Sequence, residues 1–172
     1  MIIKSKDLAI AGLLISVGII LPIAFHSFNM GPMFLPMHIP ILIGGFLLPW
    51  GYACIVGAAT PLLSFLFTSM PPYPTVLTMT AELITYAFFI SFFYQKLKYG
   101  IYQSLIPSML IGRAISIFSN WLIIGILIGK PFGLTKVLYT LFVVGLPGIG
   151  IQLVFIPILV KFLLNGVVKE RI

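Results

Sequence analysis

The chain has 172 residues, of which 60% are hydrophobic and only 8% are charged, and its net charge is +7. A soluble domain carries roughly 25% charged residues, so this composition excludes a water-soluble globular domain. Each helical membrane crossing needs roughly 20 apolar residues, which leaves no room for a separate soluble domain. In so apolar a chain, the excess of cations indicates membrane topology rather than nucleic-acid binding.

The first apolar run covers residues 8–25 and follows a basic start, as the core of a signal peptide would. No small-residue cleavage site follows it, so we expect this run to be a transmembrane helix. Two more spans are predicted at residues 33–49 and 52–68. The tight turn Pro49-Trp50-Gly51 joins them into a hairpin.

Prolines end the third span. Residues 70–74 cannot be helical throughout, because each proline disfavours the α conformation of the residue before it. A fourth span is predicted at 75–94, a fifth at 102–128 and a last one at 146–164. The segment 134–144 is ambiguous, and we expect it at the outer membrane interface or as a re-entrant piece.

These elements predict an all-α integral membrane protein, with residues 1–172 forming a single domain of six transmembrane helices. Six spans place both termini on one side, together with seven cations: Lys4, Lys6, Lys96, Lys98, Lys161, Lys169 and Arg171. The opposite side receives only Lys130 and Lys136. Because Lys and Arg accumulate in cytoplasmic segments, both termini are predicted to be cytoplasmic.

Two ionisable residues, Glu82 and Arg113, lie inside predicted spans. A charge at the bilayer centre costs from a few to more than about 10 kcal/mol, so such residues usually serve a function. Helical spacing places other polar side chains on the same two stripes: Thr75, Thr78 and Thr85 with Glu82, and Ser116 and Asn120 with Arg113. Two compatible interpretations follow, a buried ion pair that joins two helices and a set of ligand contacts.

Other polar and aromatic residues gather at the same outer level of the predicted bundle: His26, Asn29, His38, Tyr73, Trp121 and Gln152. The inner half is nearly devoid of polar side chains. This asymmetry favours a pocket open to the outside over a channel. The single cysteine, Cys54, excludes an intrachain disulfide and is expected to be a packing or lipid-facing residue.

Motifs of common enzymes are missing, including HExxH, GxSxG and the P-loop, so we predict a protein that is not an enzyme and needs no cofactor. His26, His38 and Glu82 lack the spacing of metal ligands, and no metal site is predicted. Without a nucleotide-binding motif, uphill transport would draw its energy from a partner protein or an ion gradient.

Residues 34–46, 57–64 and 70–72, with the pair Gly112-Arg113, resemble the substrate-binding S components of energy-coupling factor (ECF) vitamin transporters. The resemblance extends over roughly residues 5–165. It implies a multi-pass protein of a bacterial or archaeal cell membrane that binds a vitamin or vitamin precursor from outside. It also implies a transmembrane T component and two ATPase subunits as partners, and release of the solute inside when the S component topples in the membrane.

The loop at residues 69–74 is similar in place to the family's substrate-covering gate. Together with the polar stripes, the resemblance suggests these substrate contacts: His38, Tyr73, Thr78, Glu82, Arg113, Asn120 and Trp121. Arg113 suits a carboxylate, as in pantothenate, whereas Glu82 and Asn120 suit ring nitrogens such as those of hydroxymethylpyrimidine or a benzimidazole. The sequence leaves the choice open.

Small residues on the first helix, Ala9, Gly12 and Ser16, are the nearest match to the family's AxxxA-like pattern and are expected to dock on the T component. Two other functions compete with the S-component interpretation. One is a free-standing secondary carrier with Glu82 as its proton site, and the other is a structural membrane subunit whose Glu82–Arg113 pair only packs helices.

Overall fold

The computed structural model describes residues 5–26, 31–129 and 131–169, and their side chains except at residues 26, 31, 32 and 166–169. The described chain is helical without strands: α1 (Ser5–His26), α2 (Gly31–Phe34), α3 (His38–Leu47), α4 (Trp50–Thr68), α5 (Thr75–Ser91), α6 (Ile101–Asn120), α7 (Leu134–Leu138) and α8 (Leu146–Lys169). Three π-helical segments, Phe92–Lys96, Trp121–Leu127 and Tyr139–Val144, continue α5, α6 and α7. The predicted all-α class is confirmed.

Among the described residues, five helices are long and apolar enough to cross a membrane: Ser5–Phe25, Trp50–Thr68, Thr75–Lys96, Ile101–Leu127 and Leu146–Asn165. The predicted span at 33–49 differs, because α2 and α3 divide it at residues 35–37. With 10 residues, α3 is about 15 Å long, half of the roughly 30 Å hydrocarbon core. A sixth crossing would therefore need α2 and α3 together.

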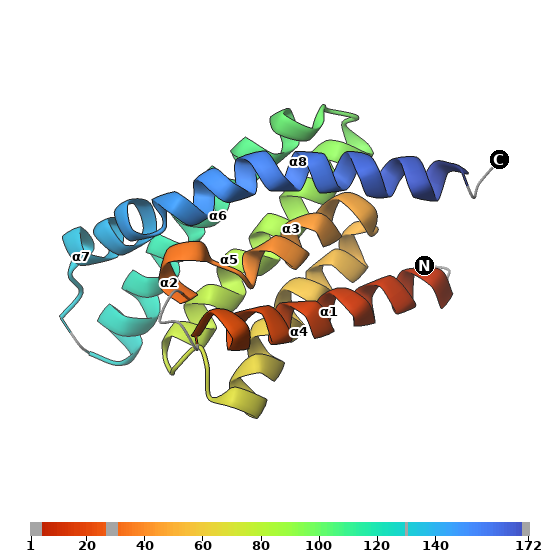
Figure 1. The fold of residues 1–172 in the computed structure, drawn as a ribbon. Coiled ribbons are helices and arrows are strands. Elements are labelled where there is room, and N and C mark those ends of the chain that lie inside the picture. Colours follow the sequence, from red (N-terminus) through yellow and green to blue (C-terminus); the bar gives the residue numbers. More distant parts are fainter. Residues whose placement is uncertain (1–4, 27–30, 130, 170–172) are drawn as a thin grey trace.

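The two ends of the molecule carry different loops. Figure 1 shows the start of α1 and the end of α8 at one end, close to the connections after α3 and before α6. The proline-rich residues 69–74 and residues 131–133 lie at the opposite end. Both described termini thus lie on one side of the bundle, as an even number of crossings requires. The cytoplasmic orientation itself stays a prediction from the positive charges.

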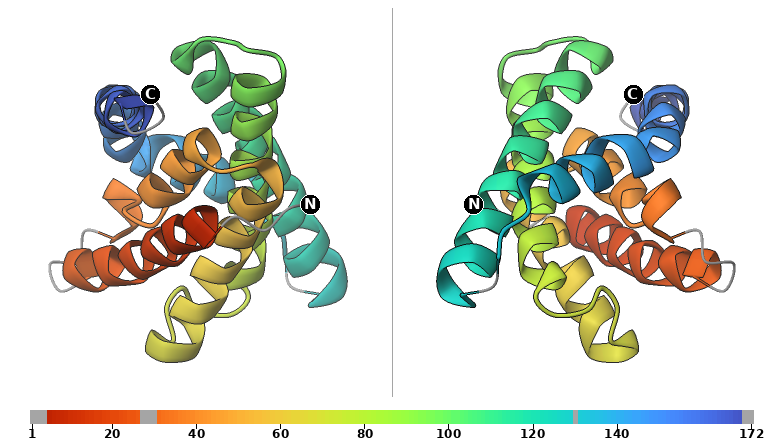
Figure 2. Two further views of the ribbon diagram at one scale, coloured as in Figure 1. Left: turned by 90° about the vertical axis from the view of Figure 1, so that its right-hand side faces the viewer. Right: turned by 90° about the vertical axis from the view of Figure 1, so that its left-hand side faces the viewer.

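The short helix α3 forms the centre of the bundle. It lies between α1 and α8 and packs against α5 (Figures 1 and 2). Eight of its ten residues are buried: His38, Pro40, Ile41, Leu42, Ile43, Gly44, Gly45 and Phe46. A helix that is apolar on all sides is typical of a protein core. His38 is the first residue of this core helix and is buried with it.

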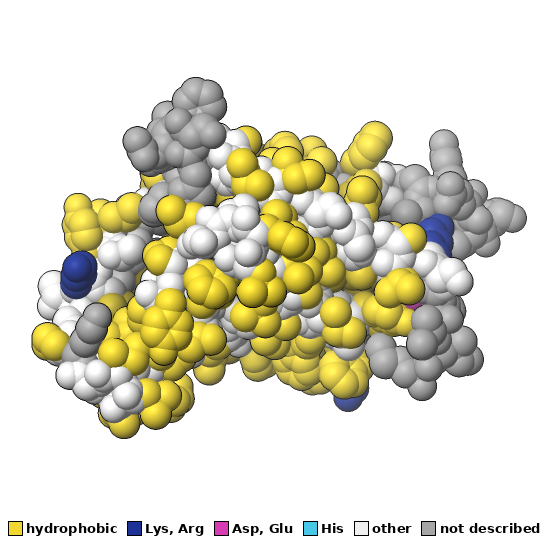
Figure 3. All heavy atoms as spheres, turned by 90° about the horizontal axis from the view of Figure 1, so that it is seen from below, with side chains coloured by type: hydrophobic (Ala, Val, Ile, Leu, Met, Phe, Trp, Pro, Cys, Tyr) yellow, Lys and Arg dark blue, Asp and Glu magenta, His cyan; other side chains and the backbone are white. Residues whose placement is uncertain are grey.

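Glycines let α5 approach its neighbours closely. A Cβ on Gly57 of α4 would lie 2.8 Å from the Leu83 carbonyl oxygen, and one on Gly112 of α6 would overlap the Tyr86 ring. Small residues allow this kind of close contact between membrane helices. Many large hydrophobic side chains are exposed, and the face shown in Figure 3 carries many of them with few cationic side chains, as expected for contact with lipid.

Candidate binding site

A buried cluster of polar side chains joins α3, α5 and α6. Glu82 is 3% exposed, Arg113 is 4% exposed and His38 is 2% exposed. Glu82 Oε1 lies 2.9 Å from Arg113 Nη1 and 3.7 Å from His38 Nε2. The Tyr86 hydroxyl donates a hydrogen bond of 2.6 Å to the same oxygen.

Local structure brings these groups together. Glu82 and Tyr86 are four residues apart on α5, so they share one helical face. His38 opens α3 directly after a break at which Leu35 has a φ of 50°. The Leu35 carbonyl accepts hydrogen bonds from the His38 amide at 3.0 Å and from the Gln152 side chain of α8 at 3.5 Å. The break is thereby fixed, and the imidazole faces the Glu82 carboxylate.

The cluster leaves hydrogen-bonding capacity unused. Within the described part of the chain, Arg113 Nε and Nη2 and both ring nitrogens of His38 are buried without a hydrogen-bond partner. The 3.7 Å from His38 to Glu82 is too long for a hydrogen bond. Each unsatisfied buried group costs about 1–3 kcal/mol. A cluster built only to hold helices together would satisfy these groups, so their state favours a binding role.

The cluster lies at the wall of a cavity of about 610 Å³. The cavity reaches from His38, Glu82 and Arg113 to residues 70–72 and 131–133, at the end of the molecule away from the termini. Its polar lining includes Thr75, Thr78, Ser116, Asn120, Lys136 and Thr140, and its apolar lining includes Met37, Pro71, Pro72, Met79, Ile124 and Phe132. The volume falls within the roughly 300–1,000 Å³ typical of small-molecule sites.

A family model described as "ECF transporter, substrate-specific component" matches residues 6–167, nearly the whole chain. The chain belongs to this family. The comparisons with curated proteins and with solved structures gave no match. ECF substrate-specific components, or S components, are transport subunits that take up vitamin-type solutes together with T and ATPase partners. The resemblance inferred from the sequence is thereby confirmed, and the chain is a multi-pass membrane protein.

Five of the seven predicted contacts of this S component line one cavity: His38, Thr78, Glu82, Arg113 and Asn120. The Thr78 hydroxyl donates to the Thr75 carbonyl at 3.0 Å, and the Asn120 amide nitrogen donates to the Ser116 carbonyl at 2.8 Å. Both side chains retain further polar capacity for a solute, since a hydroxyl and an amide also accept hydrogen bonds.

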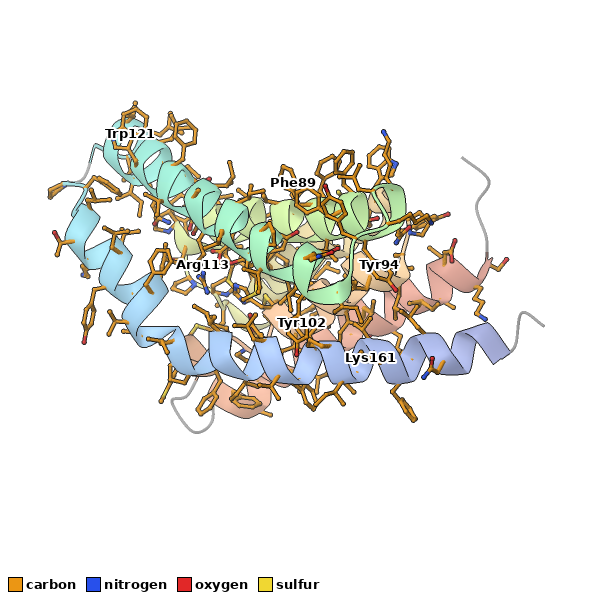
Figure 4. All side chains as sticks on the ribbon, turned by 90° about the horizontal axis from the view of Figure 1, so that it is seen from above. Phe89, Tyr94, Tyr102, Arg113, Trp121 and Lys161 are labelled. Carbon is orange, nitrogen blue, oxygen red and sulfur yellow. The ribbon has the colours of Figure 1, made fainter. Side chains whose placement is uncertain are left out.

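The other two predicted contacts lie outside the cavity lining. Tyr73 is 63% exposed, although its neighbours Pro71 and Pro72 do line the cavity. Trp121 is 44% exposed and packs on Phe118, with ring centroids 5.7 Å apart. In Figure 4, Trp121 lies on the outer side of the bundle, whereas Arg113 is directed into the space between α6 and α8.

The sequence did not predict the roles of two residues at the binding site of this S component. It also suggested polar residues that lie outside the described part of the chain. Tyr86 was missed as the carboxylate's hydrogen-bond donor, although its position one turn after Glu82 was a usable signal. Lys136 was assigned only to topology, yet it lines the cavity. The side chains of His26 and Asn29 lie outside the described residues, as does Lys130. Within the described residues, no group of three or more His, Cys, Asp or Glu is arranged to hold a metal ion.

Proposed function

We propose that this S component captures one small vitamin or vitamin precursor from outside the cell with high affinity and delivers it through an ATP-driven ECF complex. The observation that carries the proposal is the Arg113–Glu82 pair, which lines the 610 Å³ cavity while Arg113 Nε and Nη2 have no hydrogen-bond partner among the described residues. Apolar surfaces with a few converging polar groups are typical of sites for small organic ligands.

The cavity suits capture better than conduction. Beyond the cluster, toward the termini, the core is dominated by apolar side chains such as Ile41, Phe46 and Ile90. The polar side chains buried there in the described structure include Ser91, Ser104 and Ser108, and none is charged, so a solute bound at Arg113 meets no charged path across the bundle. Its release inside requires a movement of the whole subunit, and toppling against a T component driven by two ATPases would supply one. Pantothenate, hydroxymethylpyrimidine and benzimidazole-type compounds are the candidate solutes.

Calorimetry on the detergent-purified chain tests the capture step. We expect one compound of a vitamin panel to bind with a submicromolar dissociation constant. Thr78→Val should weaken this binding about 10-fold, because a lost polar contact is worth about 1–1.5 kcal/mol. Thr85→Val is the matched control, since the Thr85 hydroxyl also bonds to a carbonyl of its own helix but lies outside the cavity lining.

Silence across the panel, or equal losses in the two threonine variants, would contradict solute capture at this site and favour a structural subunit. Uptake in whole cells separates the remaining alternative. An ECF component loses uptake when the Walker lysines of the partner ATPases are replaced. A free-standing carrier with Glu82 as its proton site would keep uptake in that ATPase variant, and it would lose uptake when an uncoupler is added.

A further inference from the structure

The Arg113 guanidinium has an unused edge. Its Nη1 group points to Glu82 Oε1 at 2.9 Å, while Nε and Nη2 have no hydrogen-bond partner in the described structure. Nε and Nη2 lie on the same side of the planar guanidinium, and their parallel N–H groups match the two oxygens of a carboxylate. The ion pair with Glu82 therefore holds the guanidinium, while the edge that binds carboxylates in a bidentate manner is buried near Gly145 without a hydrogen-bond partner.

The charges around the cavity also favour an anion. The whole chain contains only three acidic residues, and of the two that the structure describes, Asp7 and Glu82, only Glu82 lines the cavity. Its charge is compensated by Arg113. Lys136, an exposed residue of α7, adds a second cation to the lining and has no ion-pair partner among the residues that the structure describes. The cavity thus carries a net positive charge, which attracts anions to its opening.

The remaining lining indicates the rest of the solute. Hydroxyl and amide groups of Thr78, Ser116 and Asn120 lie on the same helical stripes as the ion pair. Met37 and Met79 contribute apolar and adaptable surface. A solute that fits this cavity lining has a charged end, some hydrogen-bonding groups and an apolar part.

We propose that the solute is a small amphipathic monocarboxylate whose carboxylate binds the Nε–Nη2 edge of Arg113 while Nη1 keeps its contact with Glu82. This inference rests on the proposed capture function and narrows it to one chemical class. Both nitrogens are buried in the structure, so this binding requires the arginine side chain to turn its edge toward the cavity. A cationic solute, by contrast, meets Arg113 and Lys136 and competes with Arg113 for the Glu82 carboxylate.

Matched compound pairs test the inference by calorimetry on the purified full chain. Each pair differs only in the carboxylate: pantothenate and panthenol, biotin and biotin amide, nicotinate and nicotinamide. Neutral hydroxymethylpyrimidine and cationic thiamine complete the panel. In the pair that binds, we expect the carboxylate to bind about 100-fold more tightly than its neutral partner, as two charged hydrogen bonds imply.

The double variant Glu82→Gln with Arg113→Gln is the decisive control. It removes the bidentate edge, keeps the formal charge of the cavity and leaves no buried charge unpaired. The preference for the carboxylate should fall to within a few-fold. If this variant does not elute as a folded protein in gel filtration, Arg113→Lys replaces it, because lysine keeps the charge but lacks the planar fork.

The possible outcomes separate the two proposals. Equal or tighter binding of a neutral or cationic compound overturns the monocarboxylate inference and leaves solute capture intact. A carboxylate preference that survives loss of the arginine fork also overturns it. Silence of the whole panel with folded wild-type protein overturns solute capture and the inference with it.

Discussion

The Tyr86 hydroxyl and the His38 ring both approach the Glu82 carboxylate, but only one of them borders the cavity. Tyr86 is fully buried outside the cavity lining and donates a 2.6 Å hydrogen bond to Glu82. His38 lines the cavity and makes no side-chain hydrogen bond within the described structure. Tyr86 is therefore a positioning residue, whereas His38 lines the cavity with both ring nitrogens unpaired among the described residues.

Substitution of each residue should separate stability from affinity. His38→Leu is expected to weaken solute binding about 10-fold, with little loss of thermal stability, because the ring makes no hydrogen bond among the described residues and leucine keeps an apolar side chain against the Tyr86 ring. Tyr86→Phe should instead lower stability by about 1–3 kcal/mol, since a buried carboxylate loses a donor. Thermal denaturation in detergent and calorimetry measure the two effects. A His38→Leu protein with unchanged affinity and reduced stability would assign the histidine to packing.

At this scale, sequence reasoning works best for charges in apolar surroundings. Glu82 and Arg113 could be paired because they are the two ionisable residues inside the predicted spans, and a membrane charge requires a partner. The aromatic residues were harder to place. Tyr73 and Trp121 are amphipathic, and such side chains suit the membrane interface as well as a binding site. Lys136 was hidden because its short segment has no clear helical face.

The helices differ from their predicted form where the backbone departs from regular α geometry. Residues 33–49 form a nearly continuous apolar run, and hydrophobicity alone does not reveal the break at residues 35–37. Pro36 precedes α3 and Pro40 lies in its first turn, where proline is tolerated. The π-helical segments depend on i to i+5 hydrogen bonds, which the sequence pattern does not signal. Two of them, Trp121–Leu127 and Tyr139–Val144, contribute Ile124, Thr140 and Leu141 to the cavity.

The contact between α5 and α6 provides a test of helix packing. Gly112→Ala places a Cβ into the buried Tyr86 ring. We expect it to destabilise the protein by about 1–3 kcal/mol or more, because overpacking a close helix contact forces backbone shifts. It should also reduce solute affinity, since Tyr86 positions Glu82 and Arg113 follows Gly112 directly.

Gly12→Ala is the matched control for this prediction, because no atom lies within 4 Å of a Cβ built at that exposed position of α1. Its unfolding temperature in detergent should equal or slightly exceed that of the wild type, since alanine favours helix over glycine. If both alanine variants unfolded at the wild-type temperature, the α5–α6 contact would be looser than the structure indicates.

In the molecule as a whole, the cavity is separate from the exposed face of α1 that carries small residues. The cavity reaches residues 70–72 and 131–133, which lie at the end of the molecule away from the termini. On α1, Ala11 and Leu14 are buried in the core, while the small residues Ala9, Gly12 and Ser16 are exposed on the other side. The Ser16 hydroxyl donates to the Gly12 carbonyl at 2.9 Å, so its polar group is satisfied within the helix. Small residues at these positions favour a close approach by another helix.

We therefore expect Gly12→Leu to reduce co-purification with the T component without changing solute affinity, because the added side chain would separate the two helices. Gly150→Leu is the matched control, since Gly150 is an equally open glycine on the exposed face of α8. Tagged variants expressed with the T component and ATPases would be compared by the amount of partner retained, and by calorimetry on each variant alone. Equal loss of the T component in both variants would argue against a docking face on α1. Loss confined to Gly12→Leu, with normal solute binding, would place solute capture and partner assembly on separate surfaces of one small bundle.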